Sequence, residues 1–174
     1  GNEGRDVYPF HQLFVAKIVD NYDVVGHFHT KKSRDSGGGV GERWRRYLLG
    51  NLAGSPPASQ EILGLFEDEK VGLVFAEDPH CIDECANGEY IEKLLAPLGY
   101  AKRNRYHDFP LGTMFWARTE ALKSLTYLDL ATFKLSEPIP YDGSVLHAFE
   151  RVIPQLVQEA GFTVKRVYTP NTYW

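Results

Sequence analysis

Cysteine is scarce in this sequence. The 174 residues contain only two cysteines, Cys81 and Cys85, which lie four positions apart in a polar segment. Such a pair is neither a disulfide framework nor the two-residue spacing of a zinc knuckle. We therefore expect reduced thiols and a cytoplasmic protein. A metal site formed by this pair with His80 is the less favoured interpretation, because a closed structural zinc site needs four ligands.

Long hydrophobic runs and an excess of positive charge are also absent. No apolar run approaches the roughly 18 residues that a membrane-spanning helix requires, and no signal peptide opens the sequence. The 19 basic and 23 acidic side chains give a net charge of −4, which argues against a general nucleic-acid binder. We expect a cytoplasmic protein, with peripheral attachment to the inner face of the membrane left open.

What the sequence has in abundance is material for a core. Hydrophobic residues make up 43% of it and aromatic residues 13%, which suffices for one domain over residues 1–174. The first residue is not methionine. We expect a fragment of a longer chain, in which the first βαβ part of the domain is lacking.

Hydrophobic periodicity predicts alternating helices and strands. Helices are expected at residues 9–21, 41–51, 59–66, 88–98, 119–125 and 142–160, and strands at 23–28, 71–76, 109–118 and 162–168. Gly99 should end its helix, and Pro154 should kink or divide the last one. The alternation predicts an α/β fold with a mainly parallel sheet flanked by helices.

A cationic turn follows the strand at 23–28. It comprises His29, Thr30, Lys31, Lys32 and Ser33, and it suits an anion because ammonium groups and hydroxyls bind phosphate oxygens. In open α/β sheets ligands collect at the carboxyl ends of strands, which favours a binding role for this turn. A solvated lysine pair is the alternative. The glycines at 35–41 do not have the spacing of a Walker loop and favour a mobile loop.

The second chemical candidate is the segment at 142–151, DGSVLHAFER. Asp142 lies at the start of the longest predicted helix, and His147, Glu150 and Arg151 follow within its first turns. A carboxylate in this position is either a helix cap or a group that does chemistry. The sequence alone leaves both interpretations open.

Five motifs occur together in a fixed order. They are N-x-GRD-x-x-PF (2–10), HTKKS (29–33), W-R-x-x-LL-x-x-L-x-G (44–54), FP-x-GTMFWAR (109–118) and DGSVLHAFER (142–151). In this set the sequence resembles the rhamnan synthesis protein F family over nearly its whole length. The resemblance implies a fold similar to the GT-A glycosyltransferases and a role in building rhamnose-containing surface polysaccharide. This part of the argument is an analogy at the level of the fold.

The resemblance also implies a reaction and its residues. A sugar, rhamnose from dTDP-rhamnose, would be transferred with inversion to a hydroxyl of a glycan or lipid-linked glycan. Asp142 would be the base, and His147 and Glu150 would complete the catalytic set. The remaining expected site residues would bind substrate; they are Arg5, Asp6, His29, Lys31, Lys32, Ser33, Gly112, Thr113 and Arg151.

No cofactor is expected, because Lys31 and Lys32 occupy the place of the metal-binding Asp-x-Asp motif and would neutralise the diphosphate themselves. A divalent metal at His27 and His29 is the weaker option. Two other functions stay open. One is a non-catalytic carbohydrate or nucleotide-sugar binding module, and the other, least favoured, is a phosphohydrolase that uses the acidic pairs at 77–78 and 83–84.

Overall fold

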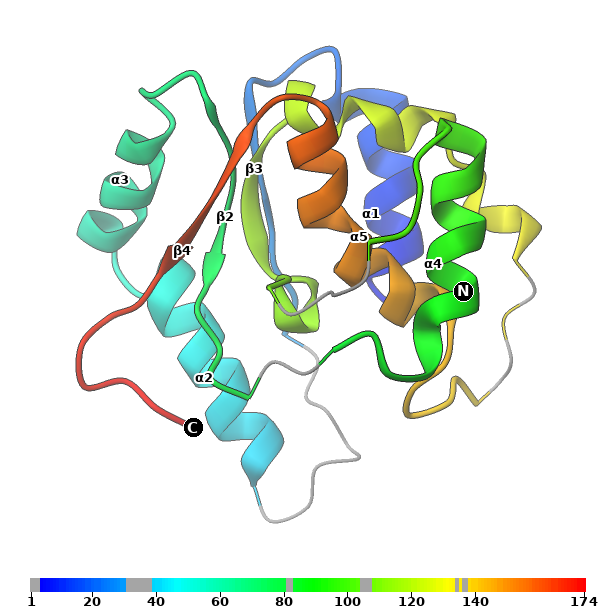
Figure 1. The fold of residues 1–174 in the computed structure, drawn as a ribbon. Coiled ribbons are helices and arrows are strands. Elements are labelled where there is room, and N and C mark those ends of the chain that lie inside the picture. The colour runs from blue at the N-terminus through cyan, green and yellow to red at the C-terminus, as the bar shows by residue number, and fades with distance from the viewer. Residues whose placement is uncertain (1–3, 31–38, 81–82, 104–107, 134, 136–137) are drawn as a thin grey trace.

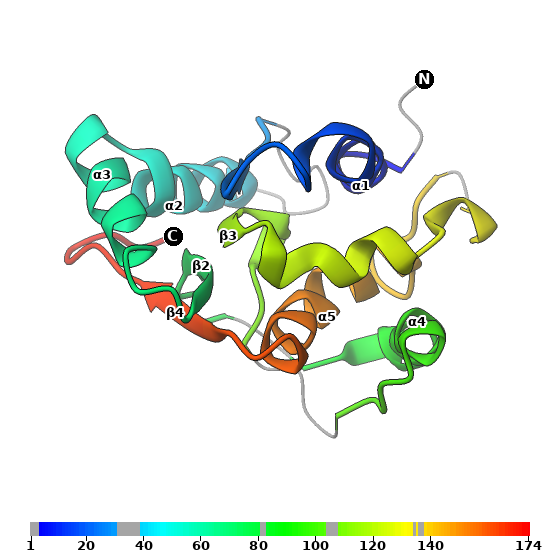
Figure 2. The ribbon, with the colours of Figure 1, turned by 90° about the horizontal axis from the view of Figure 1, so that it is seen from above.

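The computed structural model describes residues 4–30, 39–80, 83–103, 108–133, 135 and 138–174. In this part of the chain a four-stranded sheet carries helices on both faces (Figure 1 and Figure 2). The strand order is β1–β3–β2–β4, with bounds Val24–His27 for β1, Val71–Ala76 for β2, Phe115–Arg118 for β3 and Thr163–Val167 for β4. An α/β fold with flanking helices is therefore confirmed.

The sheet is mixed, and the prediction of a mainly parallel sheet was wrong. Strand β3 is antiparallel to both β1 and β2, and only β2 and β4 pair in parallel. Val74 near the end of β2 pairs with Trp116 near the start of β3. After β2 the chain therefore comes back to the same edge of the sheet, and β3 begins there. The helix between the two strands does not make them parallel. Alternation of elements does not encode this return.

This topology brings four connecting segments to one edge of the sheet. Because β3 opposes its two neighbours, β1, β2 and β4 all run in one direction and end at the edge where β3 begins. We call this edge the carboxyl edge. The segments that follow β1, β2 and β4 and the segment that precedes β3 therefore all meet there.

The helices divide between the two faces according to the alternation of the strand residues. On β3, Phe115 and Ala117 face the larger core, while Trp116 and the preceding residue Met114 face the smaller one. The larger core is covered by α1 (Val7–Leu13), α4 (Gly88–Leu95), α5 (Val145–Glu159) and the 3₁₀ helix η5 (Glu120–Tyr127). The smaller core is covered by α2 (Val40–Ala53) and α3 (Pro56–Leu65).

Several predicted elements have different ends or types. The helix expected at 9–21 is α1 followed by the π-helical turn η1 (Phe14–Ile18), and the helix expected at 119–125 is η5. Short 3₁₀ turns are η2 (Cys85–Asn87), η3 (Ala96–Leu98) and η6 (Leu130–Thr132). Gly99 ends its helix with a φ of +73°, as predicted. Helix α5 runs through Pro154 as one element, so of the two expected effects, a kink or a division, the division does not occur.

The strand expected at 109–118 is shorter than predicted. Its first half forms the 3₁₀ turn η4 (Leu111–Thr113), and only the last four residues belong to β3. Gly112 and Thr113 have φ values of +71° and +57°, which an extended strand does not permit. The apolar composition of the segment gives no sign of this turn.

No helix in the described ranges has both the length and the apolar character needed to cross a lipid bilayer.

Candidate functional site

Polar groups from four segments gather at the carboxyl edge, beside the end of β1 and the start of β3. They come from the turn before α1, the end of β1, the turn η4 and the first part of α5. We call this group the polar cluster. Its members are Arg5, Asp6, His27, His29, Gly112, Thr113, Asp142, His147, Glu150 and Arg151.

Two histidines tie the end of β1 to η4. His27 Nδ1 lies 2.5 Å from the carbonyl oxygen of Thr113, and His29 Nε2 lies 2.7 Å from that of Gly112. Since a carbonyl only accepts, each of these ring nitrogens donates its proton. The Asp6 carboxylate lies 3.9 Å from His29 Nε2. Among the described residues, Asp6 Oδ2 and His29 Nδ1 are buried without a hydrogen-bond partner.

The same contacts bear on metal binding. Each histidine has already committed one ring nitrogen to a carbonyl, and the two ring centroids lie 6.5 Å apart. Within the described ranges, no group of three or more histidine, cysteine or acidic side chains is arranged to hold a metal ion. Cys81 of the cysteine pair lies outside these ranges, and Cys85 is exposed.

A buried ion pair lies beneath the histidines. Glu150 and Arg151 are only 8% and 5% exposed, and their side chains meet at 2.9 Å. The Thr113 hydroxyl lies 3.5 Å from the other oxygen of Glu150. Burial raises the pKa of Glu150 to about 7, and the Asp6 charge adds to this increase while Arg151 opposes it. The carboxyl group can therefore change its protonation state near neutral pH.

Arg151 is held on several sides. Its guanidinium donates to the carbonyl oxygens of His147 at 2.8 Å and Asp83 at 3.2 Å, and it lies over the ring of Phe109 at 4.5 Å. A guanidinium that is fixed in this way presents a rigid positive charge. It anchors the segment after β2 to α5.

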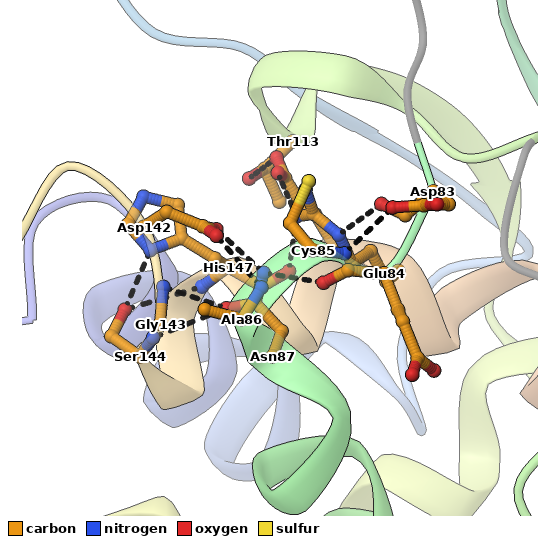
Figure 3. A network of polar contacts seen from close by, with 12 residues as sticks. Asp83, Glu84, Cys85, Ala86, Asn87, Thr113, Asp142, Gly143, Ser144 and His147 are labelled. Atoms are coloured by element: carbon orange, nitrogen blue, oxygen red, sulfur yellow. Dashed lines mark hydrogen bonds and ion pairs between the residues drawn. The ribbon is translucent and has the colours of Figure 1, made fainter.

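Asp142 is the centre of a hydrogen-bond network that joins this same segment to the start of α5 (Figure 3). One carboxylate oxygen accepts from the Ala86 N–H at 2.9 Å and the other from the Asn87 amide at 2.6 Å. The side-chain oxygen Oδ1 of Asn87 accepts in turn from the N–H groups of Gly143 and Ser144, each at 3.1 Å. The network therefore fixes both the position and the orientation of the carboxylate.

This environment decides the charge of Asp142. Partial burial acts to raise its pKa, but the hydrogen bonds from Ala86, Asn87 and Gly143 outweigh burial, and the pKa is lowered. Asp142 is therefore ionised at neutral pH. It is not the cap of α5, because that role falls to Ser144, whose hydroxyl accepts from the His147 N–H at 3.5 Å.

His147 completes this side of the cluster. Its Nδ1 lies 2.8 Å from the Ser144 hydroxyl. Burial lowers the pKa of His147, and the positive charge of Arg5 lowers it further, which places Arg5 close to this ring. The imidazole is therefore neutral at physiological pH.

Backbone strain concentrates around the same cluster. Among the described residues, four that are not glycine have positive φ: Arg5, Cys85, Thr113 and Asn171. Arg5 and Thr113 belong to the polar cluster, and Cys85 begins the turn η2, which binds Asp142. Left-handed conformations of such residues cost of order 1–3 kcal/mol and collect at functional sites.

The structure thus brings together every predicted site residue that it describes. Lys31, Lys32 and Ser33 lie outside the described residues, one residue beyond Thr30. Sequence reasoning missed Asn87, which is fully buried and holds Asp142. The only local signal was an asparagine directly before the glycine that begins a helix.

Comparison with known proteins identifies one family and two similar proteins. The profile described as rhamnan synthesis protein F matches residues 1–162. Two proteins from Xanthomonas campestris pv. campestris, both named uncharacterized protein WxcX, are similar to the chain. The relative from strain B100 is 32% identical and the relative from strain ATCC 33913 is 31% identical, each over 174 residues and 95% of this chain.

The chain spans only 24% of the length of each of these relatives. No solved structure matches it significantly. The expected similarity to GT-A glycosyltransferases is therefore not supported by any solved structure. The family match covers nearly the whole chain, however, and by that match the chain belongs to the rhamnan synthesis protein F family.

Proposed function

We propose that this chain forms the catalytic centre of a glycosyltransferase that builds a cell-surface polysaccharide in the cytoplasm or at the inner face of the membrane. The family match supports a role in rhamnan synthesis. The observation that carries the proposal is the polar cluster, in which an ionised Asp142, a neutral His147 and the buried Glu150–Arg151 pair meet at one edge of the sheet. Rhamnose is the sugar that the family name suggests, with dTDP-rhamnose as the donor.

The diphosphate of the donor lies at the turn that follows β1 in this proposal. Asp6 Oδ2 and His29 Nδ1 are buried acceptors without partners among the described residues, and the hydroxyl groups of the donor sugar next to the diphosphate would supply those partners. Arg5, Gly112 and Thr113 line the same place. Lys31, Lys32 and Ser33 follow Thr30 directly in the sequence, and in this proposal they stabilise the departing diphosphate by charge and hydrogen bonds, without a metal ion.

Asp142 receives the proton of the acceptor. The acceptor hydroxyl oxygen bonds to the anomeric carbon while the bond from that carbon to the diphosphate breaks, and the hydroxyl proton moves to the carboxylate. A single displacement of this kind inverts the anomeric centre. The supporting features are that Asp142 is ionised, partly exposed and fixed in orientation, and that each oxygen keeps a lone pair beyond its bond to the protein.

One observation favours the rival function of a non-catalytic sugar-binding module. Both oxygens of Asp142 already accept hydrogen bonds from the protein, as they would in a purely structural connection. A binding module would need the network but not the proton transfer. The two functions therefore differ in whether the charge of Asp142 is required.

The test compares two variants in the full-length parent protein. Asp142→Asn keeps the size of the side chain but removes the base, and we expect transfer of rhamnose from dTDP-rhamnose to fall by about 10²-fold or more. Asn87→Ala is the matched control, because it disrupts the same network while it leaves the carboxylate in place. We expect that variant to lose stability and to lose much less of its transfer rate per folded molecule than Asp142→Asn, because the carboxylate remains and the Ala86 N–H still holds it.

Transfer at the parental rate by a folded Asp142→Asn protein would remove Asp142 from the mechanism and favour the binding module. The same assay is run with EDTA, which we expect to leave the rate unchanged. A loss that added manganese restores would instead point to a metal at His27 and His29.

A further inference from the structure

A cavity lies at the carboxyl edge, beside the ends of β2 and β4. It is a cavity of about 320 Å³, and its walls come from α2, the segment after β2 and the tail after β4. We call it the aromatic pocket. It is lined chiefly by Tyr47, Glu77, His80, Tyr168, Tyr173 and Trp174. A volume of this size falls within the range of small-molecule sites.

The walls of the aromatic pocket are fixed by buried polar contacts. Asn51, which is only 4% exposed, accepts from the Thr169 N–H at 2.6 Å and donates to the Thr172 hydroxyl at 3.2 Å. These bonds hold the tail against α2. The hydroxyl of Tyr47 donates to the carbonyl oxygen of Glu77, which ties the same helix to the end of β2. The pocket is thus preorganised by groups outside its lining as well as within it.

Trp174 is packed between two other rings. Its ring centroid lies 4.4 Å from that of His80 and 5.7 Å from that of Trp44. The Trp44 indole N–H donates to Asp78 at 3.0 Å. Trp174 Nε1 is buried without a partner in the described part of the chain, so the pocket wall contains an unused donor. These contacts keep the aromatic faces in place around the hollow.

The chemistry of the lining selects a neutral ligand. The described lining residues include no lysine or arginine, and Glu77 contributes a carboxylate. Burial raises the pKa of Tyr47 to about 12, so its hydroxyl stays uncharged. A phosphate would find no lysine or arginine in the described lining, and the Arg166 guanidinium lies 3.9 Å from the Glu77 carboxylate. A pyranose ring fits, because its C–H face packs on aromatic rings while its hydroxyls bond to carboxylate and phenol oxygens.

The aromatic pocket adjoins the polar cluster through a single indole. A Cβ atom at Gly112 would lie 3.2 Å from the ring of Trp44. The Trp44 ring also packs against the ring of Trp174. The segment after β2 also serves both places, since residues 77–80 reach the pocket and residues 83–87 hold Asp142 and Arg151. A glycan in the pocket would therefore lie beside the proposed site of transfer.

We propose that the aromatic pocket binds one neutral pyranose residue of the glycan acceptor. The binding itself stands on the pocket alone, while the assignment to the acceptor rests on the proposed transferase function. Tyr168 and Tyr173 supply the accessible ring faces, since they are 52% and 86% exposed. The described lining offers no lysine or arginine to the anionic donor.

The test is calorimetric titration of a rhamnose trisaccharide, methyl α-glucopyranoside and dTDP into the chain and into the full-length parent. The variant Tyr168→Ala/Tyr173→Ala removes the accessible rings and should weaken trisaccharide binding at least tenfold, with dTDP binding unchanged. Tyr22→Ala/Tyr127→Ala is the matched control, because these tyrosines are 63% and 72% exposed on other parts of the surface. Circular dichroism verifies that each variant is folded.

Failure of the trisaccharide to bind the folded parent, or equal weakening in both double variants, would overturn the pocket proposal. If the trisaccharide binds but dTDP binding and transfer are both absent, the transferase function is refuted and the pocket proposal is retained. Transfer that continues with an unchanged KM for acceptor in Tyr168→Ala/Tyr173→Ala would refute the acceptor role alone.

Discussion

The polar cluster and the aromatic pocket occupy two halves of one sheet edge and are built in opposite ways. Beside the end of β1 and the start of β3 the chain buries an ion pair and His27, with His29 half-buried, and it accepts left-handed backbone at Arg5 and Thr113. At the ends of β2 and β4 it places aromatic rings that are partly exposed and largely uncharged. The element that closes each half makes the difference: the start of α5 brings charge, and the tail after β4 brings rings.

This contrast shows how one edge can separate two kinds of recognition. Buried charges in a protein interior interact strongly but are destabilising unless every group is paired. Aromatic walls give weaker and less directional contacts that tolerate exposure. The polar cluster should therefore be sensitive to pH and to single substitutions, and the aromatic pocket should be much less so.

The largest effect is expected for Arg151→Ala. The substitution leaves Glu150 buried without its partner and removes the bonds to Asp83 and His147, so the free energy of unfolding should fall by about 3–5 kcal/mol. Urea denaturation at pH 8 measures the loss. Glu150→Gln/Arg151→Ala is the control, and its loss should be smaller because no buried charge is stranded. Equal losses in the two variants would mean that the ion pair is not what stabilises this region.

The second effect is a dependence of stability on pH that comes from Glu150. Its pKa is raised from 4.5 in the unfolded chain to about 7 in the folded protein, so the folded state binds more protons between these values. The stabilising contribution is complete below pH 4.5 and is lost as the pH rises through about 7, with a slope approaching about 1.4 kcal/mol per unit.

Glu150→Gln isolates this contribution. Burial lowers the pKa of His27 and of His147, which gives a slope of the opposite sign, and these groups are unchanged in the variant. The unfolding free energy of the parent, relative to that of the variant, should therefore decrease between pH 5 and pH 7.5. Parallel stability curves would contradict a raised pKa for Glu150.

The smallest effect is expected in the aromatic pocket, for Tyr47→Phe. This change removes the hydrogen bond to the Glu77 carbonyl but keeps the ring, and it should lower the free energy of unfolding by about 1 kcal/mol. Because the pKa of Tyr47 is about 12, the loss should be the same at pH 5 and pH 8. Thermal unfolding at both values checks this, and a clear pH dependence would show that charge reaches the pocket after all.

Local signals in the sequence predicted most elements and most of the polar cluster. The run at 71–76 is β2 as expected, and glycine ended the helix at Gly99. The residues chosen for the site from four separate motifs lie together where the structure describes them. Asn87 and the aromatic pocket were not found, because a buried amide and rings from distant segments carry no local pattern.

The sequence by itself determined the composition of the core, the positions of the helices and strands and the family, since each depends on residue type and spacing along the chain. Only the tertiary structure decided the direction of β3, the turn η4 and the protonation of the clustered side chains. Strand direction depends on which edge the chain returns to, and a pKa depends on burial and on neighbours that lie far away in sequence. For that reason Asp142 and Glu150, eight positions apart on one segment, have pKa values shifted in opposite directions.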